Sequence, residues 1–204
     1  MSRQIAIVGL STSTHEDAPW GDDEWERLGL PWDSMWELID VHFEMHPLEL
    51  LKEPKAYRPD GYFDRLRSLK NLYMQQEYDE IPNAKAYPLA RVKDKCSDYF
   101  NSSISYLLAY AIWLAAISAN QEASKIGIWG VDMANITATH PDDPSFKTEF
   151  EYQRPNMEYL IGYARGLGIE VYIPEKSPLC KFQGKGIPLG TMYPTYPKRY
   201  GFLT

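Results

Sequence analysis

Hydroxyl-bearing residues follow a short apolar run near the start of the sequence. The run at residues 5–10 includes Gly9, and Ser11, Thr12 and Ser13 come directly after it. Hydroxyl groups and backbone N–H groups hydrogen-bond phosphate oxygens, and a glycine lets the backbone approach a ligand closely. The stretch therefore predicts a phosphate-binding loop, although it has neither P-loop nor Gly-x-Gly-x-x-Gly spacing. A capped turn that binds no ligand is the alternative interpretation.

Two further stretches place polar groups next to apolar segments. Gly130, Asp132 and Met133 close the apolar run that starts at Ile126, and Asp132 could accept hydrogen bonds from ribose hydroxyls. Residues 102 and 103 are serines, and they stand where the N-cap of a long apolar helix is expected. The free N–H groups and the dipole of a helix N-terminus favour an anion. We therefore expect Ser102 and Ser103 to share a nucleotide site with the loop after Gly9.

An acidic, tryptophan-rich segment suggests a site for a sugar or an acceptor. Trp20 could stack on a base or a sugar face, Asp22 and Asp23 could bind sugar hydroxyls, and His42 could contact ligand at a strand end. The alternative is that the tryptophans pack inward. His42 and His46 are four residues apart with no third ligand nearby, and the paired aspartates lack Asp-x-Asp spacing, so no metal site is predicted.

These residues require a parallel α/β sheet to bring them together. Apolar runs predict central strands at residues 5–9, 127–131 and 170–173, and helices are predicted at residues 101–119 and 154–168. Strands alternating with helices indicate a Rossmann-like sheet with right-handed crossovers, whose ligands bind outside the carboxyl ends of the strands. We expect one domain over residues 1–204, with a helical insertion at about residues 47–89 covering the strand ends.

Charge and composition limit the partners. The 204 residues carry a net charge of −7 at pH 7, which disfavours tight binding of duplex DNA unless a local basic groove exists. The start of the sequence is too short in apolar residues for a signal peptide, and the run at residues 104–119 is too short to span a bilayer. We expect a cytoplasmic protein with no membrane partner. Cys96 and Cys180 are expected to be reduced and buried.

Three segments together carry a resemblance to a known family. "SSISYLLAYA", "IGIWGVDM" and the segment that begins "EYQRPNMEYLIGYARGLG" resemble the nucleotide-binding core of bacterial sialyltransferases of the lipooligosaccharide type. The opening "AIVGLSTST" with "APWGDDEWE" also resembles a group of phage proteins. By position, the resemblance implies that the donor nucleotide is bound by Ser102, Ser103, Gly130, Val131, Asp132 and Met133.

The resemblance implies a glycosyltransferase that uses a nucleotide sugar as substrate and needs no separate cofactor. Where that family has its catalytic histidine, this chain has Glu151, which becomes the preferred general base, with His140 second and Arg154 as a partner of the leaving phosphate. The acceptor stays open between a hydroxymethylated pyrimidine in phage DNA and a small molecule. A non-catalytic protein that sequesters a nucleotide and a Rossmann-type nucleoside-processing enzyme are the alternatives.

Overall fold

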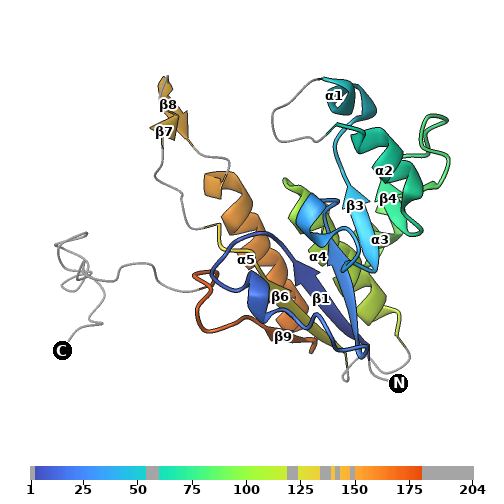
Figure 1. Cartoon of the computed structure of the whole chain (residues 1–204). Coiled ribbons are helices and arrows are strands. Elements are labelled where there is room, and N and C mark those ends of the chain that lie inside the picture. The colour runs from blue at the N-terminus through green and yellow to red at the C-terminus, as the bar shows by residue number, and fades with distance from the viewer. Residues whose placement is uncertain are drawn as a thin grey trace, which may run out of the picture.

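Seven parallel strands form one sheet in the computed structural model, which describes residues 3–53, 60–118, 124–133, 139–140, 143–147 and 150–180 (Figure 1). Their order across the sheet is β5-β4-β3-β2-β1-β6-β9. The strands are β1 (Gln4–Val8), β2 (Trp25–Gly29), β3 (Val41–Glu44), β4 (Leu72–Met74), β5 (Ala84–Ala86), β6 (Lys125–Trp129) and β9 (Glu170–Tyr172). A separate antiparallel pair joins β7 (Thr139–His140) to β8 (Asp143–Lys147). The predicted Rossmann-like α/β sheet is confirmed.

The strand order reverses beside β1. Successive strands from β1 to β5 are added on one side, and the chain then crosses back to place β6 on the other side of β1. The pairing of β1 with β6 runs in register from Gln4 opposite Lys125 to Val8 opposite Trp129. Both strands therefore end at the same edge of the sheet. Such a reversal point is where open α/β sheets bind ligands.

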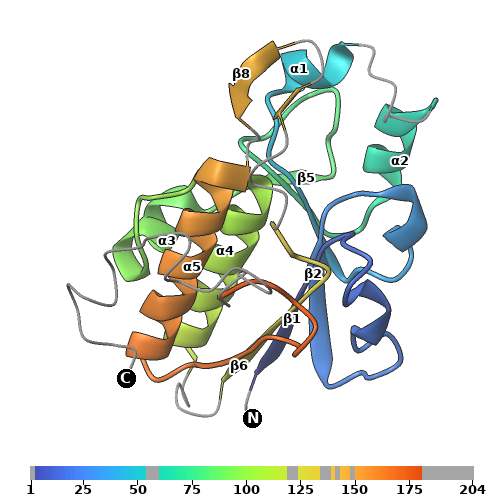
Figure 2. The same cartoon turned by 90° about the vertical axis from the view of Figure 1, so that its left-hand side faces the viewer.

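Helices cover one face of the sheet. They are α3 (Leu89–Lys95), α4 (Ser103–Ala116) and α5 (Phe150–Gly166), which Figure 2 shows gathered on one side of β1 and β6. Ile5 and Ile7 of β1 belong to the large apolar core shared with these helices. The intervening residues Ala6 and Val8 belong to a different cluster. This alternation is the period-2 pattern of a strand, and it explains why the whole of residues 5–8 is apolar and buried.

The opposite face is covered by short 3-10 helices and tryptophans. η1 (His15–Asp17) and η2 (Asp33–Met35) lie in this part of the chain. Met35, Ile39 and Trp129 complete the buried cluster with Ala6 and Val8, and three more tryptophans pack against it. The sequence DSMWELID at residues 33–40 has helical spacing, but only the 3-10 helix η2 forms there. The alternative interpretation, in which the tryptophans pack inward, holds for Trp25, whose ring lies 5.2 Å from that of Trp129.

The best-formed helix start belongs to α4. Ser102 is its N-cap, and the Ser102 and Ser105 side chains form a reciprocal capping box with each other's backbone N–H groups. Nine residues of this helix are buried, so it lies in the core between the sheet and α5. The prediction of a buried helix with a serine cap is confirmed. Gly168, with a φ of +83°, follows the end of α5, as also expected.

The segment predicted as a helical insertion is only partly helical. It contains α1 (Leu48–Lys52) and α2 (Tyr62–Ser68), but it also supplies β4 and β5, which extend the main sheet beyond β3. A second apolar cluster, which includes Leu66, Leu72 and Ile81, holds the two helices on these strands. Within the described ranges, no helix is long and apolar enough to cross a membrane.

Candidate functional site

A cavity of about 840 Å³ opens at the carboxyl ends of β1, β3 and β6, beside the start of α4. Eight of the predicted nucleotide-binding residues line it: Gly9, Ser11, Ser102, Ser103, Gly130, Val131, Asp132 and Met133. They come from three segments between Gly9 and Met133, and the sheet and α4 bring them to one place. The volume is in the range of pockets that enclose a small ligand.

Five hydrogen bonds join the loop after β1 to the loop after β6. The backbone N–H groups of Gly9 and Ser11 donate to the carbonyls of Trp129 and Gly130, at 2.9 and 2.8 Å. The buried Thr14 hydroxyl accepts from the Gly130 N–H at 2.8 Å, and the Ser11 hydroxyl accepts from the Asp132 N–H at 3.3 Å. The fifth bond runs from the Ser13 hydroxyl to Asp132 Oδ1 at 2.5 Å. The two loops therefore form one wall of the cavity.

Two glycines make this close approach possible. A Cβ on Gly9 would lie 2.4 Å from the Gly130 carbonyl oxygen, and a Cβ on Gly130 would lie 2.3 Å from the Gly9 carbonyl oxygen. Gly130 also has a φ of +63°, in the left-handed region that favours glycine. Met133 has a φ of +46°. Backbone in sparsely populated conformations is often found where a ligand is bound.

The hydroxyl residues after Gly9 have a different role from the one predicted. Ser11 lines the cavity, but its hydroxyl accepts the Asp132 N–H, and Ser13 uses its hydroxyl to hold the Asp132 carboxylate. Thr12 is exposed, and neither it nor Ser13 belongs to the cavity lining. Serine and threonine hydroxyls commonly bond nearby backbone in this way. Asp132 lines the cavity with its Oδ1 oriented by Ser13.

The start of α4 forms a second wall. The backbone N–H groups of its first turn have no partner within the helix. The Ser105 N–H donates to the Ser102 hydroxyl, whereas for those of Ser103 and Ile104 no acceptor is found among the described residues. Both Ser103 and Ile104 line the cavity. The preceding residue, Asn101, donates to the Tyr152 carbonyl and so ties this start to α5.

The carboxyl end of β3 supplies two polar residues that were not predicted as site residues. His46 lines the cavity, and its Nδ1 lies 2.6 Å from Oε1 of Glu44, a buried carboxylate at the last position of β3. Glu44 also accepts from the His46 N–H at 3.1 Å and from the Tyr62 hydroxyl of α2. The sequence signal was present as a Glu-x-His at the end of a short strand, where ligand-binding residues are expected.

Aromatic and apolar side chains complete the lining. Trp32, Phe100, Tyr106 and Phe150 lie around the cavity, together with Leu30 and Met45. Flat aromatic faces can stack on a nucleobase or pack against the apolar face of a sugar. The cavity thus combines an apolar, aromatic part with a polar part made by Asp132, Ser103 and His46. Such a combination suits a ligand with a ring and several hydroxyl groups.

The acidic segment predicted to bind a sugar lies elsewhere. β2 pairs with β1 from Trp25 opposite Gln4, so the residues just before Trp25 lie at the amino edge of the sheet. Asp23 lines a different, shallow pocket there, and Asp22 accepts from the Glu24 N–H at 2.9 Å. The cavity lies at the opposite, carboxyl edge. Asp22 and Asp23 therefore do not line this cavity, and their predicted binding of sugar hydroxyls stays a prediction.

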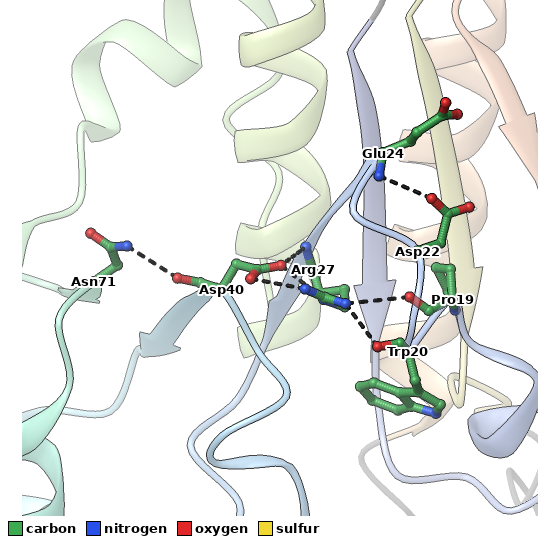
Figure 3. A network of polar contacts seen from close by, with 7 residues as sticks. All are labelled: Pro19, Trp20, Asp22, Glu24, Arg27, Asp40 and Asn71. Carbon is green, nitrogen blue, oxygen red and sulfur yellow. Dashed lines mark hydrogen bonds and ion pairs between the residues drawn. The ribbon is translucent and has the colours of Figure 1, made fainter.

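Arg27 of β2 fastens this segment to the sheet (Figure 3). Its guanidinium donates to both carboxylate oxygens of Asp40, at 2.8 and 3.1 Å, and to the Trp20 carbonyl at 3.0 Å. The Asp40 hydrogen bond raises the pKa of Arg27 above its ordinary value. Trp20 itself donates from its indole to the His15 carbonyl and is not in the cavity lining. The network is structural, and the predicted stacking of a ligand on Trp20 in this cavity is not supported.

His42 is inside the protein, away from the cavity. It is 3% exposed in the middle of β3, and its ring lies 5.8 Å from that of Trp36. Burial lowers the pKa of His42 to about 4, so the ring is neutral at neutral pH. Its place in the strand explains the difference from the prediction, since the strand continues for two residues beyond it and the ligand edge is reached only near His46.

Of the predicted catalytic residues, only Arg154 has a described side chain, and it does not line the cavity. Arg154 is buried, and its Nε donates to Glu158 at 2.9 Å while one terminal nitrogen donates to the Pro178 carbonyl at 2.8 Å. It thus holds the segment after β9 against α5, and a contact with a leaving phosphate is not supported. Glu151 lies in the first turn of α5 and His140 in β7, but their side chains are outside the described residues.

Comparison of the chain with protein-family models, with curated proteins and with solved structures gave no match. The geometry of the cavity is therefore the basis for inferring a function. In the described part of the chain, no group of three or more histidine, cysteine, aspartate or glutamate residues is placed to hold a metal ion.

Proposed function

We propose that the chain binds a nucleotide in the cavity and transfers a glycosyl group from a nucleotide sugar. The observation that carries the proposal is the position of the cavity at the strand-order reversal, between the joined loops of β1 and β6 and the start of α4. Rossmann-like sheets bind nucleotides at this place. The resemblance of the segments at residues 102–111 and 126–133 to the nucleotide-binding core of sialyltransferases supports the same ligand.

Each part of the cavity has a partner on a nucleotide. The N–H groups of Ser103 and Ile104 and the dipole of α4 suit a phosphate, which needs donors and positive potential. The Asp132 carboxylate suits the ribose hydroxyls, because it accepts two hydrogen bonds from a vicinal diol. Trp32 and Tyr106 lie in the same lining and offer flat faces for the base. No metal or further cofactor is required for these contacts.

The proposed acceptor is a small molecule rather than DNA. The chain carries a net charge of −7, whereas a surface that holds duplex DNA has to neutralise several phosphates. Among the described residues, the cavity is lined by hydroxyl, amide and aromatic groups with Asp132 as the carboxylate, and no lysine or arginine belongs to the lining. A hydroxymethylated pyrimidine in phage DNA is accordingly the less favoured acceptor.

A non-catalytic nucleotide-binding protein is the second candidate. The position of Arg154 favours it, because its guanidinium is bonded to Glu158 and Pro178 and does not line the cavity. A protein that only sequesters a nucleotide does not need to stabilise a leaving phosphate. It would use the same loops and aromatic faces.

Turnover separates the two candidates. Isothermal titration of the full chain against a panel of nucleoside mono- and diphosphates should identify one base with a Kd in the micromolar range. Incubation with the matching nucleotide sugars should then release free nucleotide, measured by chromatography. Binding without release would support the sequestering protein. Failure of every nucleotide to bind, in a folded sample, would contradict both candidates.

A further inference from the structure

The Glu44, His46 and Tyr62 side chains form a hydrogen-bonded group at the edge of the cavity, defined here as the β3 triad. The three residues come from the end of β3, the short loop before α1, and the first residue of α2. Glu44 is buried, with a side-chain exposure of 7%, whereas the His46 side chain is 47% exposed and lines the cavity. The group thus links the buried Glu44 side chain to a histidine that lines the cavity.

Both Glu44 oxygens are used. Oε1 accepts from the backbone N–H of His46 at 3.1 Å and lies 2.6 Å from its Nδ1, and Oε2 accepts from the Tyr62 hydroxyl. A carboxylate accepts hydrogen bonds and does not donate them, so Nδ1 carries the proton in this contact. A buried carboxylate is tolerated only with such bonds. The imidazole is therefore held in the tautomer whose Nε2 has a lone pair.

The backbone around His46 is also restricted. The next residue is Pro47, which disfavours the helical conformation for His46. Pro47 is also the N-cap position of α1, with an extended ψ of 144°. Together with the bond from its own N–H to Glu44, this places His46 at the point where the chain leaves the sheet.

We propose that His46 is the general base of this site and that Glu44 is its positioning residue. The inference rests on the proposed glycosyl transfer. As the acceptor oxygen attacks the anomeric carbon, Nε2 of His46 takes the proton of the acceptor hydroxyl. The new C–O bond forms while the bond from the anomeric carbon to the nucleotide phosphate oxygen breaks, and the phosphate leaves with the electron pair. The imidazolium, stabilised by the Glu44 carboxylate, then returns its proton to solvent.

The assignment differs from the one expected from the sequence. The resemblance implied Glu151 as the base, because it stands where that family has its catalytic histidine, with His140 second. His46, in contrast, lines the cavity together with Asp132 and the start of α4. A base and a phosphate site in one cavity satisfy the first geometric requirement for the transfer.

Substitutions in the β3 triad test the inference with the nucleotide sugar that the wild-type chain turns over. His46→Gln should lower kcat by about 100-fold or more, the usual contribution of a general base, with the Kd of the free nucleotide changed less than threefold. Glu44→Gln should lower kcat with little change in KM, and Tyr62→Phe should have a smaller effect in the same direction. Glu49→Gln, on the exposed side of α1, is the matched control and should behave as wild type.

A second measurement does not depend on activity. Long-range proton–nitrogen NMR spectra distinguish the two neutral tautomers of a histidine, and the signals of His46 are assigned by their loss in His46→Gln. The wild-type protein should show the tautomer protonated at Nδ1, and Glu44→Gln should show a mixture of both.

The outcomes separate the inference from the function on which it rests. A wild-type protein that turns over a nucleotide sugar, with His46→Gln within threefold of it, overturns the role of His46 and leaves the glycosyltransferase in place. The tautomer protonated at Nε2 in the wild type overturns the positioning by Glu44. If the wild-type protein turns over no nucleotide sugar, the glycosyltransferase and the base assigned to it both fail.

Discussion

Replacing Gly130 by alanine should destabilise the protein, because this residue is where the loops of β1 and β6 touch. The φ of Gly130 is +63°, and an L residue held in the left-handed region costs about 1–2 kcal/mol. The added Cβ would also lie 2.3 Å from the Gly9 carbonyl oxygen, a distance that real Cβ atoms do not adopt. The strand ends must therefore move apart.

That movement weakens hydrogen bonds that can be named. The Gly9 N–H donates to Trp129 and the Ser11 N–H donates to Gly130, and both bonds cross the contact. A net contribution of about 0.5–1.5 kcal/mol for each gives, with the backbone term, a loss of about 2–5 kcal/mol. Small domains are stable by about 5–15 kcal/mol, so the loss should be easily measured.

Urea unfolding followed by tryptophan fluorescence gives the free energy of unfolding from the midpoint and slope. The matched control is Gly162→Ala on α5, where an added Cβ meets nothing within 4 Å. This control should raise stability by about 0.5–1 kcal/mol, because alanine is the better helix former. A free energy for Gly130→Ala within about 0.5 kcal/mol of wild type would refute the close contact of the two loops.

Three further predictions use other residues of the structure. Asp132→Ala should raise the Kd of the bound nucleotide by about 5- to 150-fold in calorimetry, equivalent to about 1–3 kcal/mol, while the exposed control Asp98→Ala should not; a loss of stability with normal binding would mean that Asp132 is only a structural cap. Because burial lowers the pKa of His42 from 6.5 to about 4, the unfolded chain binds a proton between these pH values that the folded protein does not. The free energy of unfolding therefore has its full value above pH 6.5 and decreases, by up to about 3 kcal/mol, as the pH falls towards 4. His42→Leu should therefore show a smaller loss of stability between pH 7 and 4.5, and an unchanged loss would contradict this origin. Burial raises the pKa of Cys96 to about 11, whereas Cys180 is exposed; a disulfide reagent at pH 8 should modify Cys180 first, and Cys180→Ser should remove the fast phase.

The central strands and the buried helix could be predicted because their signals are local. β1 and β6 are short and mostly apolar, β9 has the alternating pattern Glu-Val-Tyr, and α4 is a long apolar segment with a serine at its start. Each of these patterns lies within a short stretch of sequence and depends on no distant residue. The order of these elements was then enough to predict a parallel sheet and the edge at which a ligand binds.

Three strands of the main sheet that were missed, β2, β4 and β5, have no such pattern. β2 reads Trp-Glu-Arg-Leu-Gly, and its charged residues are accounted for by partners far away, such as Asp40 for Arg27. β4 and β5 have three residues each and are strands because β3 is beside them. Whether such a segment forms a strand is decided by its pairing with a neighbouring strand and not by its own β-propensity.

The missed β2 strand also explains why the acidic segment does not line the cavity. If no strand began at Trp25, Asp22 and Asp23 would follow directly on the loop after β1, at the carboxyl edge of the sheet. The strand makes the chain return to the amino edge first, so both residues end on the far side of the sheet from the cavity. His46 was not predicted as a site residue for a related reason. Glu44 joins it to Tyr62, which comes from another segment, and no spacing rule links the two.

The loop after Gly9 shows why residue type alone did not give the role of each hydroxyl. Ser11, Ser13 and Thr14 all bond groups of the β6 loop, so their hydroxyls stabilise the wall of the cavity before any ligand is bound. Hydroxyls already bonded in this way have less capacity for phosphate. We infer that a ligand is contacted by Asp132, which this wall positions, and by the start of α4 and His46, which also line the cavity. The rigid loop pair thus supports the site, and we infer that the phosphate is bound at the helix rather than at the serine-rich loop.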